Sequence, residues 1–184
     1  MHWILGVLVV LLSSCQGAPQ ERHYTEETME APSVNTSNRV LGLSWDVPEG
    51  WRQEGADKMR LATFREASDP EAIDCSIVSL EGAAGGLEAN IKRWMGQIEL
   101  TASTKDLAFF IDSAPSISIQ SGQKARVYDL ARLKFTDDLI GKTMLVVMIE
   151  LSQSTVFVKM IGSFEAVKKN KNNFFKLIES IDYS

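Results

Sequence analysis

One segment constrains the fold more than any other: Thr143-Met144-Leu145-Val146-Val147-Met148-Ile149. After Thr143, its residues are apolar at odd and even positions alike. Side chains of a β-strand alternate between the two faces of a sheet. A strand that is apolar on both sides must be covered on both sides. Two helices with apolar stripes are available to cover it. The stripes are Leu87, Ile91, Trp94 and Ile98 in a helix from Leu87 to about Leu100, and Phe164, Val167, Phe174, Ile178 and Ile181 in a helix over 164–181.

Shorter elements fill the rest of the chain from about residue 40 onwards. Alternating patterns predict further strands over 41–47, 59–65, 74–80, 116–120, 125–133 and 155–161. Pro48-Glu49-Gly50 predicts a turn, with Trp51 as an apolar anchor after it. Ser103 and Asp106, three residues apart, predict the start of a second short helix. We therefore expect an α+β fold, with a mostly antiparallel sheet and helices on both faces.

The first residues have the form of an exported leader. An apolar run of about ten residues is too short for the roughly 20 that span a bilayer, and it ends in Leu12-Ser13-Ser14-Cys15. This ending resembles the lipobox of bacterial lipoproteins. The resemblance implies a signal peptide over 1–14, acylation of Cys15, and, because Gln16 replaces the aspartate of inner-membrane retention, an outer-membrane anchor facing the periplasm. The alternative is an ordinary secretory leader in which Cys15 is incidental.

The segment after Cys15 is acidic and poor in large apolar residues. It contains Glu21, Glu26, Glu27 and Glu30 against Arg22, and these account for most of the excess of 24 acids over 19 bases. Such a composition predicts a flexible linker, so we divide the chain into a lipidated linker over 15–38 and one domain over 39–184. The domain is close to charge balance, which does not favour nucleic-acid binding. Lysines 168, 169, 171 and 176 are interpreted as a solvated helix face.

No catalytic pattern is found in the domain sequence. Both histidines, His2 and His23, precede it, which excludes Ser-His-Asp and Cys-His catalysis and histidine-bearing zinc sites. Cys75 has the context of a small buried thiol, and Asp137-Asp138 reads as a turn rather than a calcium loop. We predict no catalytic residues, metal or cofactor. Paired carboxylates leave a hydrolase or lyase as the alternative.

One polar arrangement is a candidate binding site. Asn90, Arg93 and Gln97 follow one flank of the Leu87 helix beside Trp94, and Lys159 is a further candidate. Amide and guanidinium groups at this spacing can hold a carboxylate or a peptide backbone. The alternative is structural: the polar side chains satisfy backbone groups, Arg93 pairs with a nearby acid, Trp94 lies in the core, and Lys159 pairs or extends to solvent.

Short motifs resemble known exported proteins. Val47-Pro48-Glu49-Gly50-Trp51 is similar to the opening of PsbP-like domains, and the order of elements resembles their α/β/α sandwich. The segment over 85–97, Gly-Gly-Leu-Glu-Ala-Asn-Ile-Lys-Arg-Trp-Met-Gly-Gln, resembles a signature of uncharacterised exported proteins of planctomycete-type bacteria, as do Phe157-Val158-Lys159 and Gly162. The resemblance implies a fold and a location in the envelope, but no reaction.

These features together predict a lipid-anchored, non-enzymatic binding or assembly module of the bacterial cell envelope. Its expected partners are the membrane, through the lipid on Cys15, and an envelope protein or a small anionic ligand. The alternative is a small periplasmic hydrolase or lyase that uses carboxylates.

Overall fold

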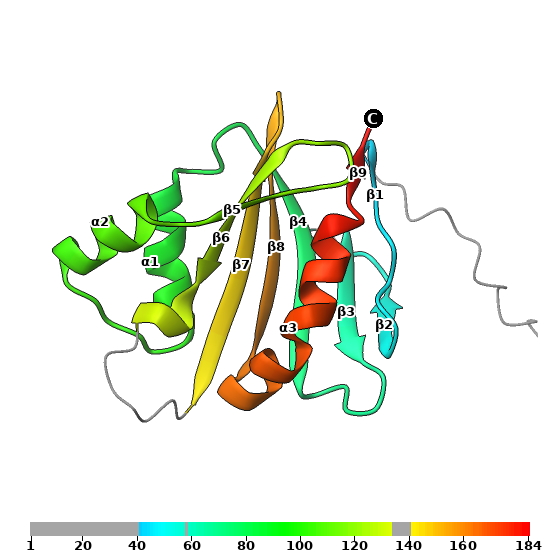
Figure 1. The fold of residues 1–184 in the computed structure, drawn as a ribbon, viewed down its shortest axis with the longest axis horizontal. Coiled ribbons are helices and arrows are strands. Elements are labelled where there is room, and N and C mark those ends of the chain that lie inside the picture. The colour runs from blue at the N-terminus through cyan, green and yellow to red at the C-terminus, as the bar shows by residue number, and fades with distance from the viewer. Residues whose placement is uncertain (1–40, 58, 134–140) are drawn as a thin grey trace, which may run out of the picture. The chain divides into compact units, whose positions relative to one another are not determined.

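A seven-stranded antiparallel sheet runs through the residues that this computed structural model describes, which are 41–57, 59–133 and 141–184 (Figure 1). All of them belong to one compact unit of the chain. The predicted leader, Cys15, the linker and the Asp137-Asp138 turn lie outside the described residues. The strand order is β2 (Trp51–Glu54), β3 (Ala62–Glu66), β4 (Ile73–Glu81), β8 (Ser154–Ser163), β7 (Lys142–Glu150), β6 (Lys124–Asp129) and β5 (Ser116–Ser118).

Helices cover this sheet on both faces. Helices α1 (Leu87–Gln97) and α2 (Thr104–Asp112) lie on one side of β7 and β8, and α3 (Phe164–Glu179) lies on the other (Figure 1). Two short strands, β1 (Leu43–Ser44) and β9 (Asp182–Tyr183), pair near the C-terminus. This arrangement confirms the predicted α+β class, with an antiparallel sheet between layers of helix. None of the described helices is long and apolar enough to cross a membrane.

Strand β7 separates two apolar cores, as its sequence predicts. Leu145, Val147 and Ile149 join the core under α3, and the intervening Met144, Val146 and Met148 join the core under α1 and α2. Each fully buried aliphatic side chain contributes about 1.5–3 kcal/mol of transfer free energy. Burial on both faces therefore makes β7 the structural centre of the domain.

Cys75 belongs to the core beneath α3. It is a free thiol with no exposed surface, and burial raises its pKa far above the usual range of a thiol. This confirms the prediction of a small buried cysteine. A thiol that stays protonated and out of contact with water is a poor nucleophile.

The structure corrects several predicted elements, and the strand expected over 59–65 begins only at Ala62. The strand expected over 125–133 ends at Asp129, whose Oδ1 accepts a hydrogen bond from Ala131 N at 3.2 Å and turns the chain into a 3₁₀ helix, η1 (Leu130–Leu133). The strand expected over 41–47 shortens to β1, because Leu41 and Gly42 have positive φ. Trp51 does more than anchor a turn, since it begins β2.

Candidate functional site

Asn90 holds the start of α1 together. The chain enters this helix through Gly85 and Gly86, both with positive φ, and no side chain caps it from the preceding position. Asn90 Nδ2 instead donates to Ala84 O at 2.8 Å and to Gly86 O at 2.9 Å. Its Oδ1 accepts from Arg93 Nη1 at 2.9 Å. Both amide hydrogens of this buried side chain are thus used within the chain, as the structural alternative expects for Asn90.

Arg93 and Trp94 have different surroundings. Arg93 is exposed on α1, and its hydrogen-bond partner is the amide oxygen of Asn90. The described partner of Arg93 is thus the amide oxygen of Asn90, one turn back on the same helix, and the pairing of Arg93 with an acid stays a prediction. Trp94 is buried, with its ring edge-on to Phe157 at 5.3 Å between centroids. This tryptophan packs in the core and offers no open ring face to a ligand.

Gln97 and Lys159 are candidate binding residues from distant parts of the chain, and they form a hydrogen bond with each other. Lys159 Nζ donates to Gln97 Oε1 at 3.3 Å, from the middle of β8 to the last turn of α1. Burial lowers the pKa of Lys159, and the nearby positive charge of Arg60 lowers it further, while Asp74 acts in the opposite direction. The ammonium of Lys159 is therefore half-buried against a neutral amide.

Lys159 borders a polar part of the sheet that we call the charged face. It comprises Arg52, Glu54, Arg60, Arg65, Asp74 and Lys159. Lys159 lies opposite Ser76, which lies opposite Thr63. Directly opposed residues of an antiparallel pair share a face, and so do residues two apart. Arg65 and Asp74 therefore emerge on the side of the sheet that carries α1.

An ion-pair chain links these residues across three strands. Arg60 donates to both oxygens of Asp74, at 2.8 and 3.3 Å. Arg65 bridges Asp74 and Glu54 at 3.6 Å each, and Arg52 reaches Glu54 at 3.1 Å. The apolar core under α1 and α2 draws mainly on β6, β7 and β8, so these helices leave β2, β3 and the start of β4 to polar side chains. Three arginines share two carboxylates on the charged face, and Lys159 adds a fourth cation.

Sequence reasoning missed Arg60, Arg65 and Asp74. The local signal was present, because polar residues alternate with apolar ones in Thr63-Phe64-Arg65 and in Asp74-Cys75-Ser76. This pattern shows that each strand has a polar face, but it does not show which strands are neighbours. The strand order β3-β4-β8 places both polar faces beside Lys159. The sequence pattern of a single strand does not predict this order.

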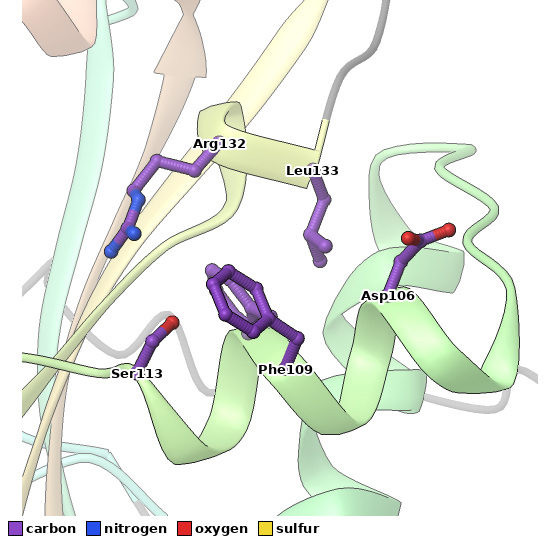
Figure 2. A pocket seen from close by; sticks show the side chains of 6 residues that line it. Asp106, Phe109, Ser113, Arg132 and Leu133 are labelled. Carbon is purple, nitrogen blue, oxygen red and sulfur yellow. The ribbon is translucent and has the colours of Figure 1, made fainter.

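A separate hollow lies between α2 and η1. Figure 2 shows Phe109 of α2 and Ser113, which directly follows this helix, facing Arg132 and Leu133 of η1, with Asp106 one turn before Phe109 on α2. Its volume is about 140 Å³, and Phe109 beside it is 71% exposed. The lining contains a single carboxylate. Among the described residues, no three His, Cys, Asp or Glu side chains gather closely enough to hold a metal ion.

Comparisons with known proteins give similarity of structure only. No protein-family model matches the chain, and no curated protein matches its sequence. Similar solved structures include a Bacteroides thetaiotaomicron protein (11% identity, TM-score 0.45), the cyanobacterial PsbP of Synechocystis (13%, 0.44), and LpqN of Mycobacterium tuberculosis, described as involved in cell envelope biogenesis (10%, 0.47).

The matches cover 78%, 78% and 77% of this chain, and 45%, 87% and 83% of the other chains, respectively. This chain thus spans less than half of the Bacteroides protein. One of these structures is a PsbP. Because every one of these TM-scores is below 0.5, the α+β assignment depends on the strand order and the helix layers described above.

Proposed function

We propose that this protein is a lipid-anchored, non-enzymatic module of the bacterial cell envelope that binds an acidic segment of another envelope protein on its charged face. The proposal combines the lipobox-like Leu12-Ser13-Ser14-Cys15 with the excess of cations around Lys159. The similarity of residues 85–97 to exported planctomycete-type proteins favours the same location. The charges extend over four strands, β2, β3, β4 and β8, and the hollow at α2 lies elsewhere. An extended partner fits such a surface better than a small molecule.

The environment of Lys159 is the observation that carries the proposal of binding. Its ammonium is partly withdrawn from water, and its pKa is lowered by that burial and by Arg60. Asp74, the nearest carboxylate of this face, is already bridged by two arginines. A carboxylate supplied by a partner would gain a charge-assisted hydrogen bond there. It would also relieve the repulsion between Lys159 and Arg60.

The enzymatic alternative is less well supported. A hydrolase of the expected type needs two carboxylates close together in a deep pocket. The described lining of the α2 hollow contributes Asp106 alone, and that of a larger pocket beside α3 contributes Asp129 alone. The carboxylates of the charged face are bridged by arginines, so they are already engaged in ion pairs. That arrangement suits binding better than proton transfer.

Binding is tested with a fluorescein-labelled octaglutamate peptide and fluorescence anisotropy at low salt. We expect Lys159→Gln to raise the Kd about five- to tenfold, because it removes the half-buried cation. Lys92→Gln is the matched control, since Lys92 is an exposed lysine of α1 paired with Glu88, and it should change the Kd less than twofold. Salt should weaken binding to the wild type. Equal effects of the two substitutions, with both variants folded, would exclude the charged face as the binding surface.

The anchor is tested separately by metabolic labelling with an alkyne fatty acid. We expect the wild-type protein to carry the label and Cys15→Ala to lose it, because the thiol of Cys15 is the proposed acylation site. Two or more acyl chains would give stable membrane attachment, whereas one chain is marginal. Undiminished labelling of Cys15→Ala, or an unlabelled wild type, would refute the anchor without affecting the test of the charged face.

A further inference from the structure

A second pocket lies on the other side of the sheet, beside the first two turns of α3. Its volume is about 230 Å³. The described lining comes from the end of β6, η1, the start of β7, and α3: Asp129, Ala131, Thr143, Phe164, Val167, Lys168 and Lys171. Small-molecule sites typically measure about 300–1,000 Å³. This pocket therefore suits a compact organic molecule, and it is far larger than the space that one water needs.

Thr143 presents an unsatisfied hydroxyl in this lining. Its side chain is only 1% exposed, and within the described part of the chain Oγ1 has no hydrogen-bond partner. An unsatisfied buried hydroxyl destabilises a protein by about 1–3 kcal/mol. Valine has nearly the same shape and would fill this strand position without that penalty. A hydroxyl retained beside a pocket is explained if it bonds to a molecule in the pocket.

The charges around the pocket favour an anion. Asp129 is already satisfied, because its Oδ2 accepts from Lys171 Nζ at 2.9 Å and its Oδ1 accepts from Ala131 N at 3.2 Å. Lys168 adds a further positive charge from the exposed side of α3. Phe164 and Val167 supply apolar walls on the same helix. The pocket thus combines a net positive charge, one free hydroxyl and an apolar surface.

We infer that the pocket bounded by Thr143, Phe164, Val167 and Lys168 binds a small monocarboxylate with an apolar body. Thr143 Oγ1 donates a hydrogen bond to the ligand, Lys168 and Lys171 balance its charge, and Phe164 and Val167 pack against its hydrocarbon part. Thr143 shares the sheet face of Leu145, which faces α3, whereas Lys159 faces α1. This site is therefore distinct from the charged face, and the two can succeed or fail independently.

The probe is 4-fluorobenzoate, titrated into the full-length protein and followed by ¹⁹F NMR, with 4-fluorobenzamide as the uncharged analogue. We expect saturable binding of the benzoate and at least fivefold weaker binding of the benzamide. Thr143→Val should weaken benzoate binding at least fivefold while leaving Tm unchanged or higher, because it removes an unsatisfied buried group. Lys168→Gln should weaken binding about threefold or more. Lys176→Gln, at the other end of α3, is the matched control and should have no effect.

Three results would overturn the inference. The first is the absence of saturable benzoate binding to the wild-type protein. The second is benzamide binding as tightly as benzoate, since the site would then not select an anion. The third is an unchanged Kd in Thr143→Val, because the hydroxyl would then contact only water. The Tm measurement ensures that weaker binding is not attributed to loss of the fold.

Discussion

Gly162→Ala is expected to destabilise the domain by about 3 kcal/mol, which is near the upper end of the usual penalty for overpacking. Gly162 lies in β8 between Ile73 of β4 and Thr143 of β7. A Cβ at this position would lie 2.5 Å from Ala72 O and 3.3 Å from Ile73 Cγ2. The nearest obstacle is a backbone carbonyl, so it cannot move without displacing the central strands. Guanidinium unfolding followed by tryptophan fluorescence measures the loss.

Gly96→Ala is the matched control for this substitution. Gly96 lies inside α1, and a Cβ there would meet nothing within 4 Å. Because alanine is the better helix former, the variant should gain about 0.5–1 kcal/mol. Both glycines belong to the motifs that resemble exported proteins, yet only Gly162 is required by packing. A loss below 1 kcal/mol in Gly162→Ala would show that β4 and β8 can separate locally, contrary to this explanation.

The elements that sequence reasoning predicted well are those encoded by neighbouring residues. The doubly apolar pattern of 143–149 identified the buried strand β7 and the need for helices on both faces. The spacing of Ser103 and Asp106 located the start of α2, where Ser103 Oγ accepts from Asp106 N at 3.2 Å. These signals operate within one or two turns of chain, so they do not require knowledge of the tertiary structure.

The site was predicted less completely because its contacts join distant segments. Lys159 and Gln97 are 62 residues apart, and both were candidates, but nothing local indicated that they meet. The polar positions Arg65 and Asp74 became part of the same face only through strand order. Asn90 is the opposite case, because its contacts are local. Its side-chain amide donates to backbone carbonyls of the turn that precedes its own helix, so this polar residue serves the local structure. A polar residue in a pattern does not by itself distinguish a ligand contact from a backbone contact.

A buried network at the end of β3 should make stability depend on pH. Glu66 is 6% exposed; its carboxylate accepts hydrogen bonds from Lys169 Nζ, from Asn170 Nδ2 at 2.9 Å and from Ser68 Oγ at 2.9 Å. Asn170 Oδ1 in turn accepts from Trp51 Nε1 at 2.8 Å, which ties α3 to β2. The bond from Lys169, followed by that from Asn170, lowers the pKa of Glu66 from 4.5 to about 2.

Glu66→Gln is therefore expected to destabilise the domain at neutral pH by about 2 kcal/mol. The full pKa shift corresponds to about 3 kcal/mol, and we reduce this because the Lys169 side chain is 67% exposed and screened by solvent. Since the folded-state pKa is depressed, the stabilisation is complete above the unfolded value of about 4.5 and is lost as pH falls towards 2. Urea unfolding at a series of pH values measures this dependence.

The wild type and Glu66→Gln should consequently differ most above pH 5 and converge near pH 2, because protonation of Glu66 removes the same charge that the substitution removes. Glu88→Gln is the control, since Glu88 is an exposed carboxylate that also pairs with a lysine, and it should retain the wild-type pH profile. Curves for wild type and Glu66→Gln that stay parallel from pH 7 to pH 2 would contradict the depressed pKa. In that case the effect of the substitution would come from hydrogen-bond geometry, and the charge of Glu66 would not hold α3 against β3.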